Sequence, residues 1–359
     1  MHETVRVTTA ALAILWIAAL HAGSGDAGCG AGPDGPARSV ASDPACAAPS
    51  RLAETGLYAG GRIDAIDPRN RAYLPQYPLW TDGAAKARWI YLPPGAAIDT
   101  TDPNDWGFPV GTKFWKEFRF DGRKVETRFL WRASADRWVF ATYLWNEEGT
   151  DALLAPDGGA RNVYQFAPGR GHDVPSRADC RACHGERRPG PLGFNPLQLS
   201  TDRDPNAIHG EPLAPGMLTL ATLDRDGVLS PARPELVAKA PRIHAKDPAT
   251  RAVLGYFAAN CGHCHNGSNE IAYDGPSLKH NDVLDGDAVA AALLAKATTW
   301  QIPGQPEGTS RMLALGHAEA SAMLARMKSR RPSSQMPPLG TALADEEAIA
   351  AISKWIGTR

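Results

Sequence analysis

The stretch Cys261-Gly-His-Cys264-His265 decides how the rest of the chain is interpreted. A Cys-x-x-Cys-His run is the attachment site of c-type haem, in which both thiols add to vinyl groups and the adjacent imidazole binds the iron. Cysteines three residues apart on one helical turn face the same porphyrin edge. The stretch therefore predicts a covalently bound haem at Cys261 and Cys264, with His265 as one axial ligand of the iron.

A methionine loop downstream supplies a candidate for the opposite side of this iron. Met336 follows His265 by 71 residues, inside Ser334-Gln-Met-Pro-Pro-Leu-Gly340. The two prolines after it hold the loop out of helical conformation, and a thioether is a common sixth ligand of haem iron. Asp345 then caps a predicted closing helix, whose apolar residues recur at helical spacing: Ile349, Ile352, Trp355 and Ile356.

The order of helix, haem motif, methionine loop and closing helix resembles class I cytochrome c, over residues 247–359. Asp247 and Pro248 are a typical N-cap and first-turn pair for the helix that leads into the motif. The resemblance implies that this helix crosses the closing one, with Phe257 near Trp355. It also leads us to expect His263, inside the motif, at the surface.

A second copy of the motif, Cys180-Arg-Ala-Cys183-His184, predicts a second haem. The chain's own composition gives roughly 0.003 such runs by chance, so two copies are not an accident. The alternative is a zinc site built from both cysteine pairs. However, 77 residues separate Cys183 from Cys261, and zinc gives no reason for a histidine directly after each pair. We therefore expect two haem c groups.

The sixth ligand of the iron held by His184 is left open by the sequence, including the case in which there is none. The candidates are His172, His209, Met217 and His244. His172 precedes Cys180 by only eight residues, which leaves little chain to cross the porphyrin. His209 and Met217 have enough chain to wrap round it, and we favour His209.

The N-terminal sequence indicates export. Arg6 precedes an apolar run over residues 10–20, which is typical of a secretory signal peptide at residues 1–22 and short for a membrane span. An uncleaved anchor is the alternative, and only that would bring the protein to a membrane. Bacterial c-type haem is attached outside the cytoplasmic membrane, so the motifs agree with a periplasmic location.

Residues 23–50 are rich in Gly, Ala, Pro and Asp and are predicted to be a flexible linker. Cys29 and Cys46 within it either form a disulfide in an oxidising compartment or remain free thiols. The formal net charge of the whole chain is −1, which does not indicate a nucleic-acid partner.

Residues 51–165 are predicted to form an antiparallel β-sandwich. Seven of the ten tryptophans lie between Trp80 and Trp145, and Asp121-Gly122 is a strong hairpin signal. Alternation of side chains suggests one packed and one partly wet face, so Glu117, Glu126 and Arg128 are either solvated strand residues or parts of a site. The strand-like runs cover residues 87–92, 113–120, 124–131 and 138–145.

Beyond the haem motifs, the chain resembles a family of exported dihaem c-type cytochromes of poorly defined role. The resemblance covers roughly residues 51–359 and rests on five stretches: Tyr77-Pro-Leu-Trp-Thr-Asp-Gly83, Phe108-Pro-Val-Gly-Thr112, Glu126-Thr-Arg128, Pro175-Ser-Arg-Ala-Asp-Cys180 and Gln335-Met-Pro-Pro-Leu-Gly-Thr341. It implies a multidomain α+β fold, in which the β-sandwich is followed by two mainly α-helical cytochrome c-type haem domains, at residues 166–246 and 247–359.

Related domains occur fused to quinoprotein sugar dehydrogenase-like propellers. The resemblance therefore implies an electron carrier whose redox partner is a quinoprotein dehydrogenase or another cytochrome. The alternative is a dihaem peroxidase or oxidase-like enzyme, in which the first haem iron keeps an open position. Arg326, Lys328, Arg330 and Arg331 approach the methionine loop, where they either pair with haem propionates, dock an acidic partner or form an ordinary charged helix end.

Overall fold

The structure is a computed structural model that describes residues 47–184, 190–267 and 276–358. The predicted signal peptide, most of the linker, Cys29 and Cys46 lie outside the described residues. In the ranges that are described, no helix is both long enough and apolar enough to cross a membrane.

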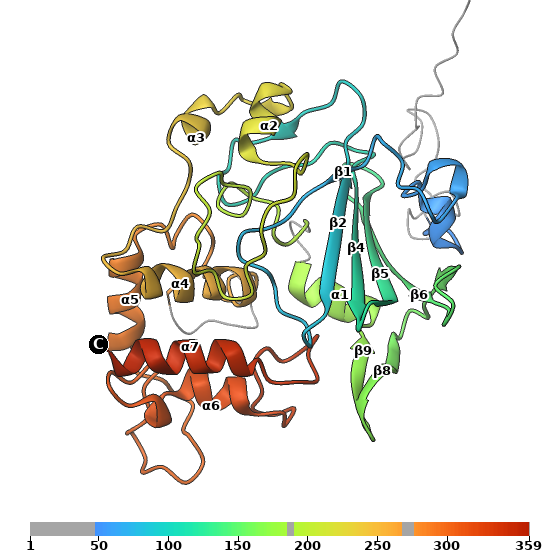
Figure 1. Cartoon of the computed structure of the whole chain (residues 1–359). Coiled ribbons are helices and arrows are strands. Elements are labelled where there is room, and N and C mark those ends of the chain that lie inside the picture. Colours follow the sequence, from blue (N-terminus) through green and yellow to red (C-terminus); the bar gives the residue numbers. More distant parts are fainter. Residues whose placement is uncertain (1–46, 185–189, 268–275, 359) are drawn as a thin grey trace, which may run out of the picture.

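A six-stranded antiparallel sheet organises the N-terminal half of the chain (Figure 1). The turn between the strands that end at Phe120 and begin at Arg123 contains Asp121 and Gly122, both with positive φ angles, so the predicted hairpin is confirmed. In spatial order the strands are β1 (Arg71–Ala72), β2 (Ala85–Tyr91), β4 (Lys113–Phe120), β5 (Arg123–Arg132), β6 (Trp138–Trp145) and β7 (Ala152–Leu154).

Both faces of this sheet are packed, in each case mainly by turns and loops. On one face Trp115, Phe129 and Tyr143 pack with residues around the 3₁₀ turns η3 (Leu52–Thr55) and η4 (Ala59–Gly61). On the other, Phe114 and Phe140 join a core completed by residues of the 194–229 region. Two-stranded sheets complete the β-structure: β3 (Ile98–Asp99) with β10 (Leu229–Ser230), and β8 (Ala160–Ala167) with β9 (Arg170–Val174).

The predicted fold class, a β-sandwich followed by two mainly α-helical cytochrome domains, is wrong. The described residues are mostly organised by the large antiparallel sheet, and they contain seven α-helices, of which α2 and α3 span only six and five residues. The helices are α1 (Arg177–His184), α2 (Leu220–Arg225), α3 (Pro234–Ala238), α4 (Pro248–Asn260), α5 (Gly286–Ala295), α6 (Ala322–Lys328) and α7 (Glu346–Gly357). Side-chain alternation in a strand reveals two faces but not what covers them, and here loops do so.

The C-terminal helices form a second core. Figure 1 shows α4, α7 and α6 stacked in that order, with the 3₁₀ turn η5 (Ala318–Ala320) nearby. Asp247 and Asp345 cap α4 and α7 by accepting the amide hydrogens of Thr250 and Ala348, at 2.8 and 3.1 Å, as their sequences predict. Phe257 and Trp355 are both buried in this core.

The segment that leads into β2 joins the two cores. The buried Tyr77 ring belongs to the C-terminal core and contacts α4 at Gly255, where an added Cβ atom would lie 2.1 Å from a ring carbon. Three residues further on, the amide of Trp80 donates to the Asn260 side chain at 2.7 Å. The haem motif that follows Asn260 is therefore fixed against the N-terminal half of the chain.

This contact predicts that Gly255→Ala destabilises the protein. The methyl group has to displace the Tyr77 ring, and overpacking of this kind costs about 1–3 kcal/mol of the free energy of unfolding. Gly357→Ala, at the end of α7 with no atom within 4 Å of the added Cβ, is the matched control. Urea denaturation measures both variants, and equal stability for the two would contradict the close approach.

Candidate haem-binding site

The second Cys-x-x-Cys-His motif is formed by a tight turn at the end of α4. The amide of Cys261 donates to Phe257 O at 2.8 Å, and the amide of His265 donates to Cys261 O at 2.8 Å. Between the cysteines, Gly262 lies against Leu278, whose carbonyl oxygen would be 2.3 Å from an added Cβ. Close packing at this point thus sets the spacing of the two thiols and the imidazole.

The predicted ligands of this motif line one pocket. Cys261, Cys264 and His265 lie on its wall together with Met336, which is 71 residues further along the chain. The space between atoms in the pocket is about 1470 Å³, its open mouth included. Its other walls are largely apolar, and include Leu278, Leu293, Met312, Met323, Met327 and Trp300.

Arginines of α6 and the following turn hold the Met336 loop by its backbone. Arg330 donates to Leu343 O at 2.9 Å, to the Thr341 hydroxyl at 3.0 Å and to Met336 O at 3.3 Å. Arg326 donates to Ser334 O at 3.1 Å, and Arg326 O accepts the amide of Met336 at 2.9 Å. Arg326 and Arg330 therefore support the loop, a role that the sequence did not suggest.

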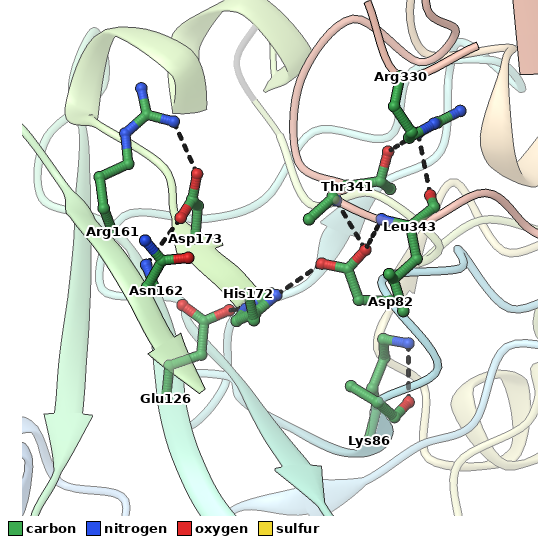
Figure 2. A network of polar contacts seen from close by, with 12 residues as sticks. Asp82, Lys86, Glu126, Arg161, Asn162, His172, Asp173, Arg330, Thr341 and Leu343 are labelled. Atoms are coloured by element: carbon green, nitrogen blue, oxygen red, sulfur yellow. Dashed lines mark hydrogen bonds and ion pairs between the residues drawn. The ribbon is translucent and has the colours of Figure 1, made fainter. Parts of the chain in front are cut away.

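Asp82 anchors the same loop from the N-terminal half (Figure 2). One carboxylate oxygen accepts the amides of Ala342 and Leu343 at 2.8 and 2.9 Å, and the other lies 2.8 Å from His172 Nδ1. His172 Nε2 lies 3.2 Å from Glu126, which also pairs with Arg128 at 2.6 Å. A buried polar network thus connects β5 to the methionine loop.

The charges of this network stabilise one another. Burial alone would lower the pKa of His172, but its hydrogen bonds to Asp82 and Glu126 outweigh burial and raise it. Burial alone would raise the pKa of Glu126, but Arg128 and His172 lower it. Sequence reasoning missed Asp82 and His172 as a pair because 90 residues separate them; the only signal was that Asp82 and Glu126 lie in stretches that carry the family resemblance.

The first motif lies on α1, beside the large sheet. Ser176 caps this helix through reciprocal contacts with Asp179. His184 Nδ1 lies 2.6 Å from Gly190 O, so Nδ1 is the protonated nitrogen and Nε2 is left for a metal. Burial lowers the pKa of His184 to about 4, so the ring is neutral near pH 7, which is the form that binds metals.

The two motifs meet. Cys183 lines the same pocket as His263 and Cys264. The influence of Cys264, followed by burial, raises the pKa of Cys183 to about 12. His263 is therefore half-buried between the motifs and not at the surface as expected, and its Nδ1 has no partner among the described residues.

Two of the four candidate sixth ligands of the first iron, His172 and His209, are held by other residues. Both ring nitrogens of His172 face carboxylates, and so do those of His209, with Nε2 at 2.9 Å from Asp345 and Nδ1 at 3.3 Å from Glu347. His209 as a ligand remains a prediction that requires these contacts to break. Met217 precedes Leu218, which belongs to the core against which Cys180 packs; His244 is exposed beside α5.

The residues present fit two covalently attached haems better than a bare metal ion. Each motif presents two thiols and an imidazole, and the second shares its apolar pocket with a thioether. In the part of the chain that is described, no group of three or more His, Cys, Asp or Glu side chains is arranged to hold a metal ion.

The charged network predicts a pH-dependent effect of His172→Gln. Because the pKa of His172 is raised on folding, its ionic contribution is complete below the unfolded pKa, near 6.5, and is lost as pH rises through the folded pKa. We expect the variant to lose about 3–5 kcal/mol near pH 6 and less as pH rises. Urea unfolding from about pH 5 to about pH 9 measures this. A pH-independent loss would contradict the ionic network, and His317→Gln, at an exposed histidine, is the control.

Comparison with known proteins finds no relative of this chain. No family model matches the chain, and neither the curated proteins nor the solved structures contain a match. The resemblance to exported dihaem cytochromes therefore stays a prediction from the sequence.

Proposed function

We propose that this chain is a periplasmic electron-transfer protein that carries two covalently bound haem c groups. Cys180, Cys183 and His184 would hold one group, and Cys261, Cys264, His265 and Met336 the other. The observation that carries the proposal is the single pocket shared by the second motif and Met336. A chance occurrence of the motif would not explain why a thioether lies in the same pocket as a Cys-x-x-Cys-His run that is distant from it in the sequence.

The ligands at the second site favour electron transfer over substrate binding. An imidazole and a thioether together fill both axial positions of a haem iron, and a thioether ligand raises the reduction potential. The chain's own residues keep Met336 in position: Arg330 binds the loop from one side and Asp82 from the other. Apolar pocket walls exclude water, which also favours the reduced, less charged state.

The pocket that Cys183 and Cys264 both line supports a function for the two groups as a pair. Cysteines on the wall of one pocket make the two attachment sites neighbours. Such neighbours suit exchange of electrons within the protein, so one group can accept electrons from a partner while the other delivers them. A quinoprotein dehydrogenase or another cytochrome is the partner that we propose.

A second candidate function follows from the contacts of His172 and His209. Because carboxylates face both nitrogens of each ring, neither imidazole is available to the first iron in this arrangement. An iron with an open position can bind small molecules, and the chain would then be a dihaem peroxidase or oxidase-like enzyme. The electron-transfer proposal instead requires a ligand such as Met217 at that position.

Carbon monoxide binding to the reduced protein distinguishes the two functions. An electron carrier with two closed irons should show no rapid spectral change on addition of the gas. Rapid, stoichiometric binding at one haem would favour the enzyme, because only an iron with an open position binds the gas without losing a ligand.

Met336→Leu tests the proposed ligand directly. Loss of the thioether should abolish the low-energy sulfur–iron charge-transfer absorption and lower the potential of one haem, because the iron loses its sulfur ligand. Met323→Leu, in the wall of the same pocket, is the matched control and should leave both properties unchanged. Redox titration followed by absorption measures them; an unaltered spectrum in the Met336 variant would refute the assignment.

A further inference from the structure

Three cationic side chains lie side by side on the face of the large sheet that packs against α1. Arg88 on β2 pairs with Lys116 on β4, and Lys116 pairs with Arg128 on β5. Because side chains alternate along a strand, all three point to the face that carries Phe114 and Phe140. We call Arg88, Lys116 and Arg128 the cationic row.

Arg88 is buried, Lys116 and Arg128 are half-buried, and the row has a single acidic ion-pair partner, Glu126, among the described residues. Arg88 is 5% exposed, and its Nη1 atom has no hydrogen-bond partner among the described residues. Neither Arg88 nor Lys116 has an ion pair in the part of the chain that is described, whereas Arg128 shares Glu126 with His172. Like charges on neighbouring strands repel, and a buried charge without a counter-ion is costly. The row therefore has the composition of an anion-binding site.

The first haem motif lies next to the cationic row. The His184 ring centroid is 5.2 Å from that of Phe140, and Phe140 is two residues from Thr142, the β6 partner of Arg128. Cys180 packs against the same core as Phe114 and Phe140. An anion held by the row would thus lie beside the group bound at Cys180 and Cys183.

We propose that Arg88, Lys116 and Arg128 bind the two carboxylates of the porphyrin attached at Cys180 and Cys183. The inference rests on the proposed function, since it assigns the anion to the haem itself. A haem carries two propionates on the edge away from its vinyl groups, and the row runs across the sheet from Arg128 toward Arg88, away from β6, on which α1 packs. Two carboxylates would supply the charge that Arg88 and Lys116 lack.

Lys116→Met tests the proposal through the potential of the first haem. A cation beside a haem disfavours the oxidised iron, which carries one more positive charge than the reduced iron, so its removal should lower the potential. Lys113→Met removes the same charge from the same strand on the opposite face and should leave this potential unchanged. Lys116→Arg restores the charge and should restore the potential. In the redox titration, the first haem is the one whose potential does not change in Met336→Leu.

The outcomes separate this inference from the proposed function. Wild-type protein without haem would refute the function and the inference together. Two attached haems whose first-haem potential is the same in Lys116→Met, in Lys113→Met and in the wild type would overturn the cationic row alone. Inorganic phosphate distinguishes the other source of anion: if added phosphate stabilises the haem-loaded protein against heat and this effect disappears in Lys116→Met, the row binds a free anion and not the propionates.

Discussion

The buried carboxylate of Asp82 is the contact on which the arrangement of the site depends. It accepts two amides of the loop that follows Met336, and it also pairs with His172, which reaches Glu126 on the sheet. A loop rich in proline cannot hold itself in position through regular hydrogen bonds. The sheet and Arg330 do so from two sides, and the thioether consequently faces the pocket that contains His265.

The close approach of the two Cys-x-x-Cys-His motifs has a similar origin. One motif ends a helix that lies against the sheet, and the other ends α4, which Tyr77 and Trp80 tie to the N-terminal half. Contacts between the halves thus bring Cys183 and Cys264 to one pocket. This explains why the segments predicted as separate domains contribute to common cores, with Tyr77 and Leu197 both buried among residues of α4 and α7.

Local patterns in the sequence predicted local features well. The caps at Asp247 and Asp345 and the hairpin at Asp121 and Gly122 depend on neighbouring residues, and the structure confirms them. Contacts between distant residues could not be foreseen. Lys116 and Arg128 alternate with aromatic residues and resemble the wet face of a strand, yet both are half-buried, and Arg128 forms an ion pair with the buried Glu126. The same limitation produced the wrong fold class, because the sequence does not reveal what covers each face of a sheet.

The central claim is that this polypeptide holds two haems through thioether bonds, and the intact mass of the mature protein tests it most directly. The chain should be produced in cells able to attach c-type haem and analysed after denaturation, which removes any group that is not covalently bound. We predict the polypeptide mass plus two haem groups, and plus one when Cys180 and Cys183 are both replaced by serine. A colourless protein with the bare polypeptide mass would contradict the account.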